Sequence, residues 1–168
     1  APYQFNSGAT YSGQWENNMR SGFGKQAWPD GAVYEGEWKR NKATGKGRFL
    51  HSDGDVYVGQ WSDNVANGLG SLTHKLRITY RGQFQNDLQD GYGVETWIEG
   101  AHYEGSYRDG QKDGWGRYQW IDGSTYEGKW VDNVIHGPGV YVTSDGRTFR
   151  GQWIYENGQL RNRMTPSS

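Results

Sequence analysis

The sequence predicts an all-β protein, built as an antiparallel meander of hairpins that stack one after another along the chain. Three observations carry this prediction. Glycine supplies 27 of the 168 residues, about twice its usual share of roughly 7%. Aromatic residues make up 15% of the chain, whereas hydrophobic residues as a whole make up only 33%. Short motifs of these two residue types recur every 23 residues, and helical periodicity is absent.

The repeat is defined by an aromatic-x-Gly-x-aromatic motif that occurs seven times without an insertion. Its copies are Tyr11-Gly13-Trp15, Tyr34-Gly36-Trp38, Tyr57-Gly59-Trp61, Tyr80-Gly82-Phe84, Tyr103-Gly105-Tyr107, Tyr126-Gly128-Trp130 and Phe149-Gly151-Trp153. A Gly-x-Gly motif follows six of them in the same phase, and most repeats close with a turn glycine. We therefore expect one array over residues 1–153, followed by a C-terminal tail over 154–168. The array comprises a partial repeat 1–10, six full repeats over 11–148 and a half repeat 149–153.

Each repeat is predicted to form one β-hairpin. In the strand Thr10–Trp15, the aromatic residues and the glycine alternate with polar residues, which is typical of a half-buried strand. The second strand is expected to run from the second glycine of Gly-x-Gly to an aromatic or histidine residue, such as Trp28. A polar loop such as Glu16–Ser21 joins the two strands. Asp-Gly provides the turn to the next repeat, because glycine tolerates a positive φ.

The core is expected to be an aromatic ladder, because few aliphatic side chains remain to fill a conventional interior. Glycine in a strand leaves room for a neighbouring ring. We predict that the tyrosine and tryptophan of each repeat pack across the glycines of the next repeat. One repeat alone could not fold.

The combination of Tyr-x-Gly-x-Trp, Gly-x-Gly and Asp-Gly in 23 residues closely resembles the MORN repeat (membrane occupation and recognition nexus). Tyr34-Glu35-Gly36-Glu37-Trp38 and Trp28-Pro29-Asp30-Gly31 are near-consensus copies, and the resemblance covers residues 5 to 153. It implies an elongated, twisted all-β meander that binds proteins or lipids and is not itself catalytic. Because MORN arrays occur in cortical cytoskeleton proteins, myosin adaptors and junctophilins, it also implies a cytoplasmic protein at the cell cortex or membrane periphery.

The departures from this pattern are local. Phe84, Tyr107 and Phe149 replace the usual aromatic residue, and Arg77 stands where other repeats carry the turn glycine. An arginine is poorly suited to a positive φ. We therefore expect the turn of the third repeat to follow a different backbone path.

No motif for catalysis or cofactor binding accompanies the repeats. The Gly-x-Gly pairs lack the third glycine and the following helix that would receive a pyrophosphate. His51 and His74 are one repeat apart, about 10 Å at two strand spacings, which is too far to chelate one metal ion easily. The chain has no cysteine and a net charge of -1, and a nucleic-acid-binding surface would be basic. We expect no catalytic residue, no metal, no cofactor, no nucleic-acid partner and no transmembrane segment.

The first functional hypothesis is a protein-binding scaffold with a groove along its aromatic face. Such a groove would accept an extended peptide or an amphipathic helix, with the rings as anchors. The residues expected to line it are Trp38, Tyr57, Trp61, Tyr80, Phe84, Tyr103, Tyr107 and Trp130.

A basic cluster in the second repeat supports a second hypothesis. Lys39, Arg40, Lys42, Lys46 and Arg48 lie within ten residues of one another. They would meet an acidic partner or an anionic phospholipid, with about 1 kcal/mol from each basic residue near an anionic membrane surface. A third hypothesis is that the repeats form the regulatory array of a larger lipid kinase, with catalysis elsewhere in that chain.

The last half repeat is expected to expose an unpaired sheet edge. Phe149, Trp153, Ile154 and Tyr155 have no complete hairpin after them, and the tail Gln159–Ser168 looks too polar to cover the rings. An unpaired edge is a template for another chain, so we predict a homodimer through the C-terminal repeat. A tail that folds back, or further repeats, are the alternatives.

Overall fold

The computed structural model describes residues 2–163. They belong to two compact units, residues 1–88 and 89–168, which are called the N-terminal unit and the C-terminal unit and are described separately. Residue 1 and residues 164–168, which end the predicted tail, lie outside the described residues.

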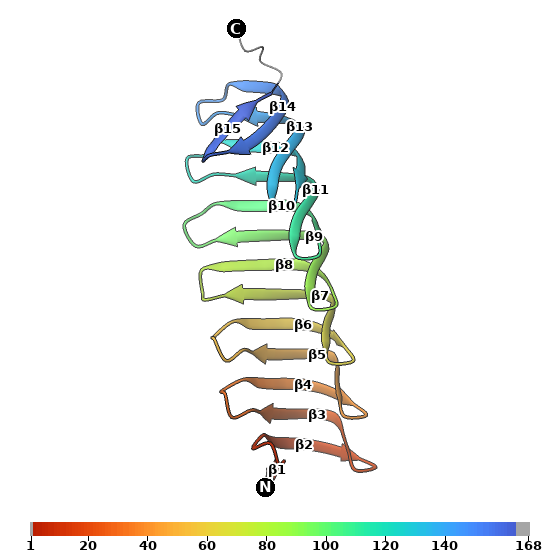
Figure 1. Cartoon of the computed structure of the whole chain (residues 1–168). Helices are drawn as coiled ribbons and strands as arrows, with labels where there is room; N and C mark the ends of the chain where they lie inside the picture. Colours follow the sequence, from red (N-terminus) through yellow and green to blue (C-terminus); the bar gives the residue numbers. More distant parts are fainter. Residues whose placement is uncertain (1, 164–168) are drawn as a thin grey trace. The chain divides into compact units, whose positions relative to one another are not determined.

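The N-terminal unit is an antiparallel β-meander in which each strand pairs with the next one along the chain (Figure 1). Its strands are β1 (Tyr3–Gln4), β2 (Thr10–Glu16), β3 (Met19–Ala27), β4 (Val33–Lys39), β5 (Lys42–Leu50), β6 (Val56–Ser62), β7 (Val65–His74) and β8 (Ile78–Gln85).

The C-terminal unit repeats the same arrangement. Its strands are β9 (Leu88–Trp97, whose first residue belongs to the N-terminal unit), β10 (His102–Arg108), β11 (Gln111–Gln119), β12 (Thr125–Val131), β13 (Val134–Val142), β14 (Thr148–Glu156) and β15 (Gln159–Asn162). The predicted all-β antiparallel meander is confirmed in both units. Over residues 2–163 no helix is long and apolar enough to cross a membrane.

The hairpin loops are shorter than the sequence predicted. Asn17 and Asn18 alone separate β2 from β3, in place of the expected loop Glu16–Ser21. Both adopt a positive φ, 53° and 63°, which is the conformation of a type I′ hairpin turn and suits asparagine. The second strand starts earlier than predicted because it contains a bulge, between the pairs Trp15–Arg20 and Gly13–Gly24. The residues of this bulge were expected in the loop.

The turn after the third repeat follows a different backbone path, as predicted from Arg77. In the other closing turns the positive φ falls on a glycine, whereas Lys75 and Leu76 carry it in this turn, with φ of 49° and 57°. Asp55 accepts a hydrogen bond from the Lys75 N–H at 3.1 Å, and another of its oxygens lies 2.7 Å from His74 Nδ1. A carboxylate just before β6 thus stabilises a turn that lacks its glycine.

Tyrosine rings form the centre of both units. The most deeply buried, each exposed by 2% or less, are Tyr11, Tyr34, Tyr80, Tyr103 and Tyr126. The hydroxyl of Tyr34 donates a hydrogen bond to the Glu37 carbonyl at 2.8 Å. Its ring makes edge-to-face contacts with Trp38 of the same repeat and Trp61 of the next, at centroid distances of 5.1 Å and 5.2 Å. The predicted aromatic ladder is therefore confirmed within this unit.

Glycine makes room for each tyrosine ring. A Cβ atom on Gly47 would lie 2.3 to 2.6 Å from ring and hydroxyl atoms of Tyr34, closer than real Cβ atoms approach other atoms. The prediction placed each ring over the glycines of the following repeat, and this detail is wrong. Tyr34 covers Gly47 within its own hairpin, and the next repeat is reached through Trp61. Own-hairpin packing follows because β4 and β5 pair at Gly36 and Gly47.

We predict that Gly47→Ala lowers the free energy of unfolding by about 3 kcal/mol, because the methyl group would overlap the Tyr34 ring. The control is Gly54→Ala: this site has nothing within 4 Å but a φ of 98°, so it should cost only about 1–2 kcal/mol for backbone strain. Urea unfolding followed by tryptophan fluorescence measures both. Equal losses would show that backbone strain, and not the ring, sets the cost.

Candidate functional site

The eight aromatic residues predicted to line a partner groove are largely buried. They lie on the side of the sheet that carries the tyrosine rings, called the aromatic face. Seven of them, Trp38, Tyr57, Tyr80, Phe84, Tyr103, Tyr107 and Trp130, are exposed by 5% or less, and Trp61 is partly buried. Much of their ring surface packs against other rings. Partner binding through these rings stays a prediction.

The structure brings three of the eight together around a cavity of about 290 Å³ in the N-terminal unit, called the Ala66 cavity. Trp61, Phe84 and Phe49 supply ring surface, and Asp87 supplies a carboxylate at its margin. The full lining is Phe49, His51, Tyr57, Trp61, Asn64, Ala66, Leu72, Phe84 and Asp87.

A cavity of about 250 Å³ lies on the aromatic face of the C-terminal unit. It includes Trp130 of the predicted set, and its lining is Tyr118, Trp120, Trp130, Asn133, Val134, Ile135 and Tyr155. Burial, together with the nearby Glu95 and Tyr155, raises the pKa of Tyr118. This hydroxyl therefore stays protonated at neutral pH and can donate a hydrogen bond.

Two basic residues on the aromatic face, Arg20 and Lys112, were not predicted from the sequence as part of a site. Arg20 lies over the Trp38 ring, with 4.8 Å between its Cζ atom and the ring centroid. Lys112 lies among aromatic rings, and its Nζ atom is 3.0 Å from Glu95. The sequence did carry a signal, because these two residues occupy the same position in the 23-residue frame.

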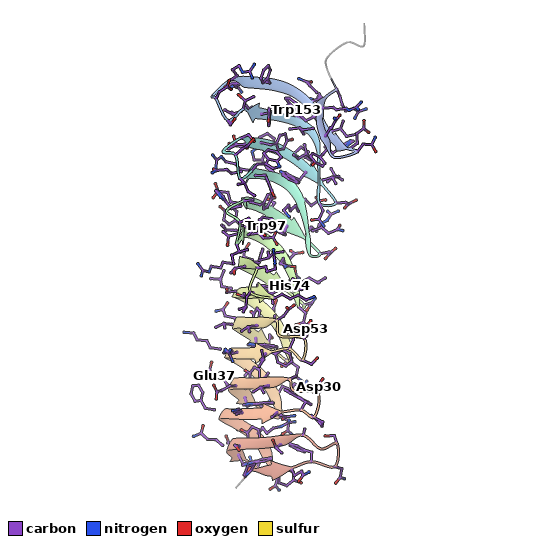
Figure 2. The ribbon with its side chains drawn as sticks, turned by 90° about the vertical axis from the view of Figure 1, so that its left-hand side faces the viewer. Asp30, Glu37, Asp53, His74, Trp97 and Trp153 are labelled. Atoms are coloured by element: carbon purple, nitrogen blue, oxygen red, sulfur yellow. The ribbon has the colours of Figure 1, made fainter. Side chains whose placement is uncertain are left out.

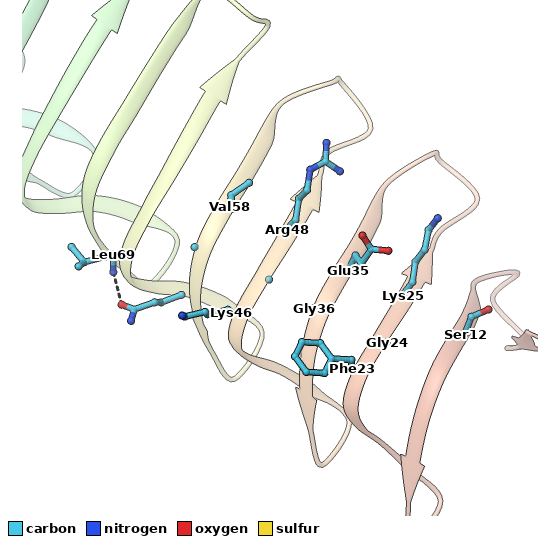
Figure 3. A pocket seen from close by; sticks show the side chains of 13 residues that line it. Ser12, Phe23, Gly24, Lys25, Glu35, Gly36, Lys46, Arg48, Val58 and Leu69 are labelled. Carbon is cyan, nitrogen blue, oxygen red and sulfur yellow. Dashed lines mark hydrogen bonds between the residues drawn. The ribbon is translucent and has the colours of Figure 1, made fainter.

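The opposite face of the N-terminal unit carries an open trough with a volume of about 750 Å³, called the glycine trough. Figure 3 shows two rows of side chains that run across the strands, with glycine backbone between them. One row comprises Ser12, Lys25, Glu35, Arg48 and Val58, and the other includes Phe23, Lys46 and Leu69.

The apolar residues of the glycine trough were missed by the sequence analysis. Phe23 and Leu69 are 67% and 61% exposed. Each is the central residue of a Gly-x-Gly motif, and strand alternation turns it away from the face where its glycines meet the tyrosine ring. The Leu69 N–H donates to Gln60 Oε1 at 2.7 Å (Figure 3), and the Phe23 N–H donates to Gln14 Oε1 at 2.7 Å. These hydrogen bonds fix the backbone of the bulge at both residues.

The predicted basic cluster is divided between the glycine trough and a hairpin tip. Lys46 and Arg48 line the trough, whereas Lys39, Arg40 and Lys42 lie at or beside the β4–β5 turn. Across residues 2–163, none of the five makes an ion pair within 4.0 Å. Their charge is therefore open to a ligand.

The prediction of an unpaired sheet edge at the last half repeat is wrong. Over the described part of the tail, the chain folds back and pairs with β14, which was the alternative. Strand β15 pairs with β14, with Trp153 opposite Asn162, and Trp153 is only 6% exposed. Asn157 and Gly158 form the positive-φ turn that allows this hairpin. Ile154 is partly buried, and Phe149 and Tyr155 keep 43% and 39% of their surface exposed. Dimerisation through these residues stays a prediction.

Several ionisable side chains of the N-terminal unit take part in packing and turns. The part of the chain that the structure describes holds no cluster of three or more metal-ligating side chains. His51 packs edge-on against Phe49, at a centroid distance of 4.5 Å. Figure 2 shows Asp30 and Asp53 on one side of the N-terminal unit and Glu37 on the other. Asp30 accepts from the Ala32 N–H at 3.0 Å, and Asp53 from the Asp55 N–H at 3.0 Å, so both carboxylates close turns.

A model of the MORN repeat matches six consecutive segments, residues 11–33, 34–56, 57–75, 80–102, 103–125 and 126–146. The chain belongs to the MORN repeat family. The six matches begin at the tyrosines that the 23-residue frame predicted, and the third ends at residue 75, inside the irregular turn. Among curated proteins, no match to this MORN array was found.

Solved structures that are similar to this chain include two domains named TCP. The TCP domain of Drosophila melanogaster SAS-4 (dCPAP), in complex with a proline-rich motif of Ana2 (dSTIL), has a TM-score of 0.51 at 14% identity, covering 83% of this chain and 82% of that one. The TCP10c domain of Drosophila melanogaster Sas-4 has a TM-score of 0.47 at 14% identity, covering 83% and 90%. At this identity the likeness is one of fold alone.

We predict that the MORN array loses stability at alkaline pH. Burial raises the pKa of Tyr57 and of Tyr126 to about 12, whereas an unfolded tyrosine ionises near pH 10. Below about pH 10 the two hydroxyls are protonated in both the folded and the unfolded state, so they add no pH dependence to stability there. As the pH rises from about 10 to 12, ionisation favours the unfolded chain and stability falls. Urea midpoints at a series of pH values measure this.

The control for the pH series is Tyr57→Phe, which removes one ionisable hydroxyl and should make the alkaline fall shallower. A wild-type urea midpoint that stays constant up to about pH 12 would contradict the prediction.

Proposed function

We propose that this MORN array is a non-catalytic scaffold that binds a protein partner through its aromatic face. The observation that carries the proposal is the Ala66 cavity, about 290 Å³ in volume, with ring surface from Phe49, Trp61 and Phe84. Cavities walled by aromatic rings are typical sites for the anchoring side chains of a partner. The second cavity, in the C-terminal unit, offers another such site beside Tyr118 and Trp130.

The fold supports a peptide ligand. The SAS-4 TCP domain, which has a similar fold, is in complex with a proline-rich motif of Ana2, so a β-meander of this kind can hold a segment of another protein. The setting that we propose is the cell cortex or membrane periphery, where MORN arrays of cytoskeletal proteins act.

Peptide selection tests the scaffold proposal. The immobilised chain is used to select binders from a displayed library of random peptides, and their affinities are measured by fluorescence anisotropy. Ala66→Met fills the N-terminal cavity, and Val134→Glu places a charge at the rim of the C-terminal one. We expect at least one of these variants to weaken binding by about tenfold, which corresponds to about 1.4 kcal/mol.

The matched control is Phe23→Ser on the opposite face, which should leave the affinity within about twofold. Circular dichroism checks that each variant is folded. The proposal fails if no peptide binds, or if Phe23→Ser abolishes binding while both cavity variants retain it.

A second candidate function is association with an anionic ligand through the glycine trough. Lys25, Lys46 and Arg48 line it, Glu35 is its one acidic residue, and the three cations make no ion pair with any residue from 2 to 163. Basic residues near an anionic membrane contribute about 1 kcal/mol each, so such binding would be weak and sensitive to salt.

Sedimentation with phosphoinositide vesicles tests this second function at low and at physiological salt. We expect binding at low salt, with Lys46→Glu/Arg48→Glu reducing the bound fraction by about tenfold. Lys39→Glu/Arg40→Glu makes the same charge change at the hairpin tip, outside the trough, and serves as the matched control. No binding to these vesicles at either salt would exclude the function, and equal loss in both variants would exclude the trough as its site.

A further inference from the structure

One position of the 23-residue frame, in the second strand of each hairpin, holds a cation in some repeats and not in others. It is occupied by Arg20 in the first repeat and Lys112 in the fifth, by Ala43 and Ala66 in the second and third, and by Gln89 and Ile135 in the fourth and sixth. The sites of Lys112, Arg20 and Ala66 together show which chemistry the aromatic face accepts.

Lys112 shows the occupied form of the site. Its side chain is only 13% exposed, and its Nζ atom lies 3.0 Å from Glu95 Oε1. The same atom lies 5.2 Å from the Trp97 ring centroid, 5.3 Å from that of Tyr103 and 5.9 Å from that of Tyr107. Aromatic faces attract a cation within about 6 Å, most strongly when it is desolvated. The site therefore holds an ammonium group among three rings and one carboxylate.

Arg20 shows that the same position also accepts a guanidinium. Its Cζ atom lies 4.8 Å from the Trp38 ring centroid and 5.2 Å from that of Phe5. Its Nε atom donates a hydrogen bond to Asn41 Oδ1 at 3.1 Å, and Nη1 donates to Gln26 Oε1. Neutral amide oxygens replace the carboxylate in this repeat, and the aromatic wall remains.

In the third repeat this position carries Ala66, whose side chain is a methyl group. The Ala66 cavity, about 290 Å³ in volume, lies beside it. The walls correspond in part, since Phe49 and His51 stand at the positions that Glu95 and Trp97 hold around Lys112. Tyr57 and Trp61 stand where Tyr103 and Tyr107 stand around Lys112, and Phe84 stands where Trp38 stands beside Arg20. The aromatic site persists without the chain's own cation.

Asp87 supplies a negative charge that the backbone does not require. Its Oδ1 accepts from the Ala66 N–H at 2.6 Å, a role that Asn41 and Asn133 fill for Arg20 and Lys112 with an uncharged amide. Its second oxygen makes no hydrogen bond or ion pair with any residue from 2 to 163. The carboxylate at the cavity margin is thus free to meet a cation.

We propose that the Ala66 cavity binds the basic side chain of a partner protein, a lysine or an arginine, between aromatic walls and against the Asp87 carboxylate. This inference rests on the proposed scaffold function and specifies the chemistry of its partner. Charge complementarity selects the occupant, because Asp87 is the acidic residue of the lining and Lys112 and Arg20 fill the equivalent space elsewhere in the chain.

The first test uses small probes and the whole 168-residue chain. N-acetyl-lysine-methylamide is titrated at constant ionic strength while the Trp61 indole N–H resonance is followed by NMR, and N-acetyl-norleucine-methylamide is the uncharged control. We expect the lysine probe to bind about tenfold more tightly than the norleucine probe. Equal affinities would overturn the proposal, because the cavity would then be merely apolar.

Charge-removing variants locate the counter-ion. Asp87→Asn keeps the hydrogen bond to the Ala66 N–H, as Asn41 and Asn133 do at their sites, and should lower the affinity for the lysine probe by about fivefold. Asp63→Asn removes the same charge from a hairpin tip outside the cavity and should leave it unchanged. Undiminished binding in Asp87→Asn would overturn the role of Asp87.

Ala66→Lys supplies the missing cation from within the chain. It should abolish binding of the probe and raise the melting temperature above that of Ala66→Met, which fills the cavity without a charge. The difference between the two variants should shrink when Asp87→Asn is added. A lysine variant less stable than the methionine variant would overturn the proposal.

These outcomes separate the cation site from the scaffold function. If selected peptides bind the aromatic face but carry no required basic residue and the lysine probe fails, the cation site is refuted and the scaffold stands. If the lysine probe binds but no peptide does, the scaffold is refuted and the cation site stands.

Discussion

The fold depends on one steric fit, between a tyrosine ring and a strand that has no Cβ atom at the point of contact. Gly47 leaves the space into which Tyr34 packs, and the Tyr34 hydroxyl is fixed by the Glu37 carbonyl. Large rings can then supply the buried apolar surface that aliphatic residues supply in most domains. The last half repeat lacks this packing of a ring on glycine. Phe149 has no hydroxyl and is 43% exposed, and Asn162 of β15 occupies the space above Gly151.

The second recurrent feature is a side chain that accepts a hydrogen bond at the bulge, as in the hairpins of the first three repeats. Gln14 and Gln60 accept hydrogen bonds from the N–H groups of Phe23 and Leu69. In the sixth repeat the equivalent N–H is missing, because the residue is Pro138, and Lys129 replaces the acceptor. A lysine side chain cannot accept a hydrogen bond. It is tolerated there because Pro138 has no N–H group to donate one. The two changes compensate each other within one repeat.

The same construction decides which surfaces remain for other molecules. Ring packing uses most of the aromatic face, and the free volume that remains lies in local cavities, such as those beside Ala66 and Ile135. On the opposite face of the N-terminal unit, the residue between the two glycines of a Gly-x-Gly motif stays exposed, as Phe23, Lys46 and Leu69 of the glycine trough do.

The sequence by itself determined the 23-residue frame, the first strand of each hairpin and the residues of the aromatic ladder, because strand alternation and the glycine–aromatic spacing are local properties. It also indicated the irregular turn at Arg77. Only the tertiary structure decided how deeply Tyr80 and Trp130 are buried, that β15 covers β14, and that Asp87 meets Ala66 at the edge of a cavity. Asp87 and Ala66 lie 21 residues apart in the sequence. Contacts over that distance follow from strand register, which the two extra residues of a bulge shift without changing the spacing of the repeats.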